Sequence, residues 1–289
     1  MARHPKRIDY YESAMAVVTL LTDFGTESEY AGVMKGVILS TDPFARIVDI
    51  SHRIAPRDIL QAALTLGASY MYFPKGTVHV AVVDPGVGGG RAILAAEAGD
   101  WTFLAPDNGL LSLVAQKAGI RRMVRVERES FFLPRVSATF HGRDIFAPLA
   151  GRLSAGLDIT ELGPPLKAGD MQQLEIPRAA VVRGELRGII MGFDRFGNIL
   201  TNIESADLQR MTDAGAGHKL DIHIGARHIS GLAPNYASVP AGRPVAVIGS
   251  RGFLEIAVNG GSARELLGGR SGDPVVVKTA RRGPPDEDV

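Results

Sequence analysis

The chain has 289 residues, which is long enough for one large domain or two smaller ones with buried cores. Its 32 Lys and Arg residues nearly balance its 31 Asp and Glu residues, so the formal net charge of +1 gives no reason to expect nucleic acid or a membrane surface as a partner. The absence of cysteine excludes disulfides, thiolate metal sites and a cysteine nucleophile, and it fits a cytoplasmic protein.

The first half of the chain alternates strand and helix patterns. We expect a loosely ordered tail over residues 1–15, and we interpret the apolar run 14–21 as a buried strand because it is too short for a membrane span and lacks a cleavage site. The predicted strands cover 17–21, 46–50, 77–83, 92–96 and 101–105, and the predicted helices cover 28–41, 58–72, 110–117 and 144–153. This alternation predicts a mostly parallel α/β sheet with helices on both faces over residues 16–175.

The second half shows a different pattern after Gly163-Pro164-Pro165, with short β-rich segments separated by turns. The predicted strands cover 188–193, 199–203, 219–224, 228–231, 245–248, 254–258 and 275–278. Gly225-Ala226 is a plausible hairpin turn between two of them. We therefore predict an all-β domain, a sandwich or a barrel, over residues 176–280, followed by a polar tail over 281–289.

Asp23 is the first candidate functional residue, because it directly follows the first predicted strand in Thr22-Asp23-Phe24-Gly25. Open α/β sheets bind ligands at the carboxyl ends of their strands, and a carboxylate there can accept both hydroxyls of a ribose. An Asp in a strand–helix connection can equally cap the helix that follows. The residues alone leave both interpretations open.

A glycine-rich segment runs from Asp84 to Arg91, with the sequence DPGVGGGR. Its glycine spacing and the lack of a following helix pattern argue against a dinucleotide fingerprint, and no Gly-Lys-Ser/Thr follows as in a phosphate-binding loop. Glycines let the backbone approach a ligand closely, and the Asp and the Arg that bracket the segment can form an ion pair across it. The alternative is a structural turn with a weak surface salt bridge.

His141 lies in Thr139-Phe140-His141-Gly142-Arg143-Asp144, at a predicted helix start. Histidine is the side chain best suited to move protons near neutral pH, although a single His is more often structural than catalytic. We interpret Asp144 as a first-turn acid near the positive end of the helix dipole.

The second domain carries two further candidate segments. Asp194-Arg195-Phe196-Gly197-Asn198 can be a plain β-turn, or it can offer an aromatic face and amide groups to a base. Gly249-Ser250-Arg251-Gly252-Phe253 can be an exposed strand connection, or it can bind a carboxylate through its Arg and Ser. A nucleoside joined to an amino acid is a ligand that would use all of these candidate groups.

The sequence resembles the SAM hydroxide adenosyltransferases, also called S-adenosylmethionine hydrolases, which are relatives of the fluorinases and chlorinases. The resemblance extends from about Val17 to Val277. The stretches that carry it are LLTDFG, MKGVI, IVDISH, FPKGTVHVAVVDPGVG, PDNGLLS, TFHGRDIFAP, GFDRFGNILTNI and GSRGFLEIAVN.

The resemblance implies an N-terminal α/β domain and a C-terminal β domain in a homotrimer, with S-adenosyl-L-methionine bound between the N-terminal domain of one subunit and the C-terminal domain of its neighbour. It places the family's catalytic triad on Asp84, Arg91 and His141 and its ribose-binding carboxylate on Asp23. Its contacts to the amino acid and adenine fall on Asp194, Phe196, Asn198, Ser250 and Arg251, with Phe253 beside them.

Three positions depart from the halogenating relatives and favour water as the nucleophile. Asp84 stands where those relatives have tyrosine, Gly142 where they have a serine that helps to hold halide, and Arg57 where the fluorinase has tryptophan. A carboxylate would repel a halide. We therefore expect hydrolysis of S-adenosyl-L-methionine at C5′ to adenosine and methionine, without a metal or another cofactor.

Two alternatives remain at this point. One is a halogenase of the same fold, and the other is a sensor that binds S-adenosyl-L-methionine or adenosine without catalysis. A methyltransferase has less support, because no glycine-rich loop of the expected kind follows the first strand.

Overall fold

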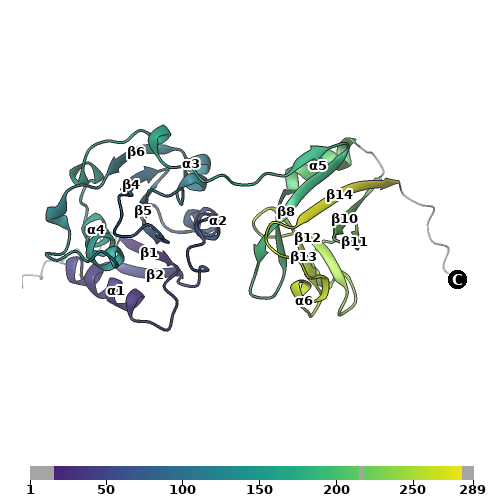
Figure 1. Ribbon diagram of the computed structural model, residues 1–289, viewed down its shortest axis with the longest axis horizontal. Helices are drawn as coiled ribbons and strands as arrows, with labels where there is room; N and C mark the ends of the chain where they lie inside the picture. The colour runs from purple at the N-terminus through teal and green to yellow at the C-terminus, as the bar shows by residue number, and fades with distance from the viewer. Residues whose placement is uncertain (1–15, 215–217, 282–289) are drawn as a thin grey trace, which may run out of the picture. The chain divides into compact units, whose positions relative to one another are not determined.

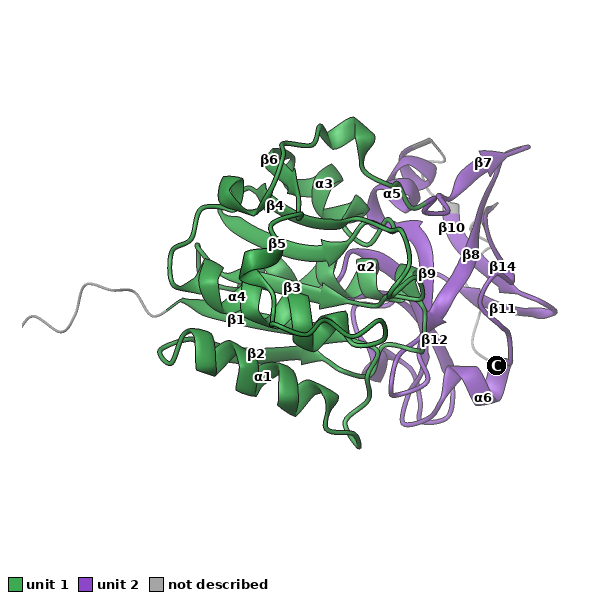
Figure 2. Ribbon diagram, turned by 60° about the vertical axis from the view of Figure 1, so that its left-hand side comes forward, with its two compact units in different colours: residues 1–174 green, residues 175–289 purple. Residues whose placement is uncertain are grey.

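A computed structural model of the chain describes residues 16–214 and 218–281. The chain divides into two compact units, Met1–Leu174 and Glu175–Val289, which are coloured separately in Figure 2. The predicted tail 1–15 and all of the tail 281–289 except Arg281 lie outside the described residues, and Arg281 is the last residue of a strand. Within the described residues, no helix is long and apolar enough to cross a membrane.

The N-terminal unit contains a mixed sheet with the strand order β2-β1-β3-β5-β4-β6. Strands β1, β2, β3 and β5 pair in parallel, whereas β4 pairs antiparallel with β5 and β6. The strands are β1 (Val17–Thr22), β2 (Arg46–Ser51), β3 (Val78–Val82), β4 (Ile93–Ala98), β5 (Trp101–Pro106) and β6 (Ile120–Arg125). The helices are α1 (Tyr30–Thr41), α2 (Ile59–Ser69), α3 (Ser112–Ala118) and α4 (Ala147–Ser154). This arrangement confirms the predicted α/β class.

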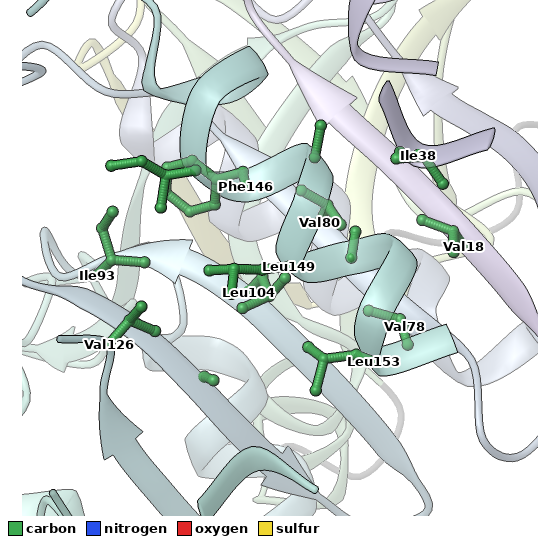
Figure 3. Close-up of a cluster of buried hydrophobic side chains, with 14 of the residues drawn as sticks. Val18, Ile38, Val78, Val80, Ile93, Leu104, Val126, Phe146, Leu149 and Leu153 are labelled. Carbon is green, nitrogen blue, oxygen red and sulfur yellow. The ribbon is translucent and has the colours of Figure 1, made fainter. Parts of the chain in front are cut away.

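Helices cover both faces of this sheet (Figure 1), and each face has its own hydrophobic core. On one face, side chains of α1 and α4 pack against alternate residues of the central strands, as Figure 3 shows for Ile38, Leu149 and Val80. On the other face, α2 and α3 pack against the intervening residues, such as Ala81. Every residue of β3 is buried, as expected for a central parallel strand covered on both sides.

The helices differ from their predicted bounds at their ends. The predicted helix 58–72 ends at Ser69 and continues as a 3₁₀ turn over Tyr70–Tyr72. The predicted helix 144–153 is a π-helical turn over Gly142–Phe146 that leads into α4. Strand β6 was not predicted, because it is an edge strand and its charged, exposed residues interrupt the apolar pattern.

The C-terminal unit contains an antiparallel sheet with the order β11-β10-β14-β8-β9-β13-β12, and β7 pairs with β8. Its strands are β7 (Ala180–Val182), β8 (Glu185–Phe193), β9 (Ile199–Glu204), β10 (His218–Ile224), β11 (Arg227–Ser230), β12 (Pro244–Ile248), β13 (Phe253–Val258) and β14 (Pro274–Arg281). The end strands β11 and β12 contact one another, so the sheet comes close to closing into a barrel. Ile224 pairs with Arg227 across the two-residue turn, which confirms the predicted hairpin.

The antiparallel sheet of the C-terminal unit confirms the predicted β domain, and two helices that were not predicted accompany it. Helix α5 (Ser205–Ala214) follows β9, and the short helix α6 (Ala263–Leu267) follows β13. Leu208 and Met211 of α5 pack into the core of the sheet. The apolar residues of α5 are too few to give a clear helical pattern, and the packing of its two buried residues on the sheet stabilises it.

Candidate active site

Asp23 lies at the carboxyl end of β1, in the connection to α1. The N-cap of α1 is Glu29, so Asp23 does not cap this helix. The Asp23 carboxylate instead accepts a hydrogen bond at Oδ2 from the backbone N–H of Arg57, with an N–O distance of 2.8 Å. Arg57 lies in the loop after β2 and has a positive φ of 67°. A neighbouring loop therefore fixes one carboxylate oxygen at the sheet edge where ligands of α/β proteins bind.

Asp84 and Arg91 form a bidentate ion pair across the glycine-rich segment between β3 and β4. Arg91 Nε lies 3.1 Å from Oδ1 and 2.9 Å from Oδ2 of Asp84, and Nη2 also donates to Oδ2. The two side chains are only 12% and 5% exposed, so this is not the weak surface pair of the alternative interpretation. A largely buried Arg–carboxylate pair has a fixed geometry and a fixed charge distribution.

His141 joins this pair as the residue just before the π-helical turn. Its Nδ1 lies 2.8 Å from Arg91 Nη2. A guanidinium can only donate hydrogen bonds, so Nδ1 is the acceptor and the proton of the neutral ring is assigned to Nε2. Burial of the imidazole and the charge of Arg91 lower the pKa of His141, against a smaller opposing effect of Asp84. The structure thus brings the three predicted triad residues together, with His141 favoured in its neutral form.

Gly88 explains how segments that are far apart in the sequence meet here. A Cβ atom built on Gly88 would lie 2.1 Å from the backbone oxygen of Ala138, and Gly88 also has a positive φ of 75°. The glycine-rich segment therefore packs directly against the backbone that leads to His141. Only glycine allows this approach.

Asp144 lies in the first turn of the helix at this site, as predicted, and its side chain also has a structural role. Its buried carboxylate accepts hydrogen bonds from Arg143 Nε, at 2.6 Å, and from the backbone N–H of Ser137, at 2.8 Å. Burial raises the pKa of Asp144, but the bonds from Arg143 and Ser137 outweigh it and lower the pKa overall. The carboxylate therefore ties together the segment on either side of His141 rather than acting only on the helix dipole.

In the C-terminal unit, Asp194 and Asn198 shape the turn between β8 and β9. Asp194 Oδ1 accepts the backbone N–H groups of Phe196 and Asn198, at 2.8 and 2.9 Å, and Oδ2 accepts Asn198 Nδ2 at 2.8 Å. These bonds match the β-turn interpretation. The turn nevertheless leaves the Phe196 ring 77% exposed, which keeps an aromatic face open to a ligand.

The connection between β12 and β13 carries the other predicted residues of this unit. Ser250 and Arg251 are exposed and Phe253 is half-buried. A backbone hydrogen bond from Gly249 N–H to the Phe253 carbonyl, at 2.9 Å, closes the loop at its base. The loop therefore presents a hydroxyl and a guanidinium on a fixed support, as a carboxylate site requires.

Tyr236 and Glu255 lie beside this loop and were not predicted from the sequence. The Tyr236 hydroxyl donates to Glu255 Oε1 at 2.6 Å. This bond and burial raise the pKa of Tyr236 to about 12. A single Tyr and Glu in a β-rich segment give no sequence signal, because only the fold brings them together.

A cavity of about 260 Å³ lies beside Arg91 in the N-terminal unit. It is lined by Gly90, Arg91, Ala92, Ile93, Arg125, Val126, Phe132 and Ile145. Sites for drug-sized ligands have volumes of roughly 300–1,000 Å³. The described residues contain no group of three or more His, Cys, Asp or Glu side chains arranged to hold a metal ion.

Comparison with known proteins identifies related chains over both units. A sequence model described as the SAM hydroxide adenosyltransferase N-terminal domain matches residues 18–163, and one for the C-terminal domain of that family matches residues 188–276. The (R)-S-adenosyl-L-methionine hydrolase of Thermus thermophilus is 39% identical over 268 residues, which is 90% of this chain and 99% of that protein.

A more distant relative is the fluorinase of Actinoplanes sp., which is 28% identical over 84% of this chain and 91% of that protein. The crystal structure of an uncharacterized conserved protein from Thermotoga maritima matches with a TM-score of 0.83 and 33% identity. That match covers 90% of this chain and 99% of the Thermotoga chain. The similarity therefore includes both the α/β unit and the β unit.

Proposed function

The chain belongs to the SAM hydroxide adenosyltransferase family, and we propose on this premise that it hydrolyses S-adenosyl-L-methionine at the ribose 5′ carbon to adenosine and L-methionine. The observation that carries the proposal is the buried contact of Asp84, Arg91 and His141. Such a group can orient and polarise one water molecule, which a protein that only senses the ligand does not need.

The reaction balances without an oxidant or a second substrate. The water oxygen forms a bond to C5′, the C5′–S bond breaks, and its electron pair neutralises the sulfonium to give the thioether of methionine. The second product is adenosine, whose 5′ hydroxyl carries the water oxygen, and one proton is released. Because the sulfonium is already a good leaving group, the protein needs mainly to position water in line with the C5′–S bond.

The triad residues have different roles in this mechanism. Arg91 is permanently charged and stabilises the hydroxide character that develops on the water oxygen. His141 uses its Nδ1 lone pair to accept from Arg91, which leaves Nε2 as a donor. Asp84 keeps free lone pairs on the carboxylate that Arg91 holds in place, so Asp84 is the group that accepts the proton from water.

The other predicted residues bind the two ends of the substrate. Asp23 accepts the ribose diol and fixes C5′. Ser250 and Arg251 bind the methionine carboxylate and Asp194 its ammonium group. Phe196 and Phe253 flank the adenine, with Asn198 beside them, and aromatic stacking contributes roughly 0.5–1.5 kcal/mol.

We also propose that the protein acts as a homotrimer in the cytoplasm, with each site shared between neighbouring subunits. The support is the family resemblance, the cavity beside Arg91 that is small for this substrate, and the near-neutral charge of the chain. Light scattering after size-exclusion chromatography tests this: a mass of three chains supports it, and a monomer that is fully active contradicts it.

The test of the proposed reaction is a multiple-turnover incubation with S-adenosyl-L-methionine in ¹⁸O-labelled water, with and without chloride. We expect adenosine and methionine in equal amounts under both conditions, with one ¹⁸O atom in adenosine and none in methionine. A 5′-chloro-nucleoside would identify a halogenase instead, and bound adenosine without turnover would identify a sensor. Activity that survives dialysis against EDTA supports the proposal that no metal cofactor takes part.

A further inference from the structure

A buried polar contact holds the turn that carries Asp23. His52 is the first residue after β2 and is only 6% exposed. Its Nδ1 lies 2.8 Å from Thr22 Oγ1, and its backbone oxygen accepts the N–H of Gly25 at 2.7 Å. His52 therefore contacts the residues on both sides of Asp23, once with its side chain and once with its backbone.

The hydrogen bonds around His52 have a consistent direction. Thr22 Oγ1 accepts the backbone N–H of Phe24 at 3.2 Å, so the Thr22 hydroxyl proton is free to point at His52 Nδ1. The ring proton of His52 is then on Nε2, which lies 3.0 Å from Asp49 Oδ1. Lys35 Nζ donates to the other Asp49 oxygen at 2.6 Å. The imidazole is thus hydrogen-bonded on one side to a hydroxyl, and on the other side it makes a short contact, outside hydrogen-bond geometry, with the carboxylate that Lys35 holds.

Asp49 is suited to this anchoring role because it stays ionised. Burial raises its pKa, but the contacts with Lys35 and His52 together have the larger effect, so the pKa of Asp49 is lowered overall. An ionised carboxylate is a stronger acceptor than a neutral group.

The far end of the same loop holds the Asp23 side chain itself. The loop runs from His52 to Arg57, and the Arg57 N–H donates to Asp23 Oδ2 at 2.8 Å. The loop after β2 thus fixes the backbone around Asp23 through His52 and the carboxylate through Arg57. Strands β1 and β2 are parallel neighbours, with Leu21 opposite Ser51, so the two loops emerge side by side.

We propose that His52 is a positioning residue that holds the Thr22–Gly25 turn and thereby presents the Asp23 carboxylate to the ribose of the substrate. This inference rests on the proposed function, and it adds a residue outside the triad and outside the substrate contacts. Preorganisation of Asp23 lowers the ordering cost of substrate binding, so losing it weakens substrate affinity more than it slows the chemical step.

The chain offers a matched control on the same strand. Thr19 of β1 makes the same kind of contact, because its Oγ1 lies 2.7 Å from Nδ1 of the buried His79, but that contact is inside the core. Thr22→Val and Thr19→Val each remove one buried hydroxyl without changing the side-chain shape. His52→Ala and His79→Ala form a second matched pair, and His52→Asn restores a polar group near the Nδ1 position.

Steady-state hydrolysis of S-adenosyl-L-methionine by the full-length variants tests the proposal. We expect Thr22→Val and His52→Ala to raise KM by about tenfold with kcat within about twofold, as loss of a hydrogen bond to a positioning group predicts. Thr19→Val and His79→Ala should lower the melting temperature but leave KM within about twofold. His52→Asn should recover part of the lost affinity. The proposal is overturned if His52→Ala and His79→Ala, or the two Thr→Val variants, change KM by the same factor.

Hydrogen–deuterium exchange on the unliganded proteins gives a readout that does not require activity. We expect the amides of residues 22–30 to exchange faster in His52→Ala than in His79→Ala, because only the former frees the turn. Equal exchange in this segment would also overturn the positioning role. Wild-type protein that neither turns over substrate nor binds adenosine would instead refute the proposed function, and the exchange result would then decide the role of His52 alone.

Discussion

Arg91 donates a hydrogen bond from Nη2 to Nδ1 of His141 over 2.8 Å, which requires that His141 be neutral. A protonated His141 could not accept this bond and would place a second cation against the guanidinium. Burial and the Arg91 charge keep the pKa of His141 below its ordinary value of 6.5, so the neutral form predominates at pH 7. The proposed triad therefore has this hydrogen-bonded arrangement near neutral pH.

The first prediction concerns the pH dependence of hydrolysis. Because the pKa of His141 is lowered, the acid limb of kcat/KM, where His141 becomes protonated, should have its midpoint below pH 6.5. His141→Asn can still accept from Arg91 but does not titrate, so it should be slower and should lack this acid limb. An acid limb at or above pH 6.5, or one that persists in His141→Asn, would contradict the assignment.

The second prediction separates the role of Asp84 from general stability. Asp84→Asn keeps the shape of the side chain but removes the proton acceptor, so kcat should decrease by about 10²–10⁴-fold with little change in KM. Glu97→Gln is the control, since Glu97 pairs with the exposed Arg121 and Arg122 in an ion pair outside the triad. Its kcat should match wild type. An Asp84→Asn enzyme with full kcat would show that water is activated elsewhere.

The third prediction concerns the contact between the glycine-rich segment and the backbone before His141. Gly88→Ala places a Cβ atom 2.1 Å from the Ala138 oxygen and strains a positive φ, at a cost of about 1–3 kcal/mol. The displaced backbone separates Arg91 from His141, so kcat should decrease at least about tenfold. Gly32→Ala, in helix α1, is the control, because a Cβ there meets nothing within 4 Å and should leave kcat unchanged. Equal kcat values for the two variants would refute this packing argument.

The sequence indicates the charged candidate residues of this site more readily than the contacts that bring those residues together in the folded chain. Asp23 and Asp84 could be selected as candidates because they follow the parallel strands β1 and β3, whose carboxyl ends meet at one sheet edge, and Arg91 precedes β4, which runs the opposite way and so begins at that edge. The role of His52 could not be predicted, since a single buried His gives no periodic signal and its partner Thr22 is 30 positions away. The same limit applies to Gly88, whose contact partner appears only in the folded chain.

The secondary-structure predictions show the same difference between local sequence patterns and contacts that exist only in the folded chain. Strand β3 was found because a run of buried β-branched residues has few alternatives. The sequence predicts an ordinary helix over 144–153, because no residue pattern distinguishes a π-helical turn such as Gly142–Phe146 from the start of an α-helix. Helix α5 was missed because its stability comes from packing against the sheet rather than from its own apolar periodicity.

The fourth prediction concerns stability in acid. His79 is fully buried, stacks on Phe103 at 5.1 Å between ring centres, and its Nε2 has no hydrogen-bond partner within the described residues. Burial lowers the pKa of His79 to about 3, whereas the unfolded chain has the ordinary value of 6.5. Between these values the unfolded state binds more protons than the folded state.

The contribution of His79 to stability is therefore complete above pH 6.5 and is lost as the pH decreases toward 3, by up to about 1.4 kcal/mol per pH unit. His79→Phe removes the titrating ring, so its free energy of unfolding should fall less steeply between pH 6.5 and 4 than that of wild type. The two proteins should show parallel curves above pH 7, measured by urea denaturation. Parallel curves below pH 6 as well would mean that His79 is not buried in neutral form.

The fifth prediction concerns why the nucleophile is water. A Cβ atom on Gly142 would lie 3.2 Å from each of Met34 Sδ, Phe24 Cε2 and Phe140 Cε2. The rings of Phe24 and Phe140 pack edge to face with centres 5.9 Å apart. A serine at this position would therefore press on three side chains at once, and these would have to shift to accept it.

Gly142→Ser should accordingly lower the free energy of unfolding by about 1–3 kcal/mol and should yield no chlorinated nucleoside at high chloride concentration. Asp84 remains in the variant and its carboxylate still repels a desolvated halide. Gly36→Ala, in the open middle of α1, is the stability control and should instead raise the free energy of unfolding by about 0.5–1 kcal/mol. If Gly142→Ser alone gives a chlorinated product, then the side chain at position 142 decides between water and chloride as the nucleophile. The Asp84 carboxylate and the aromatic packing around position 142 would then not decide it.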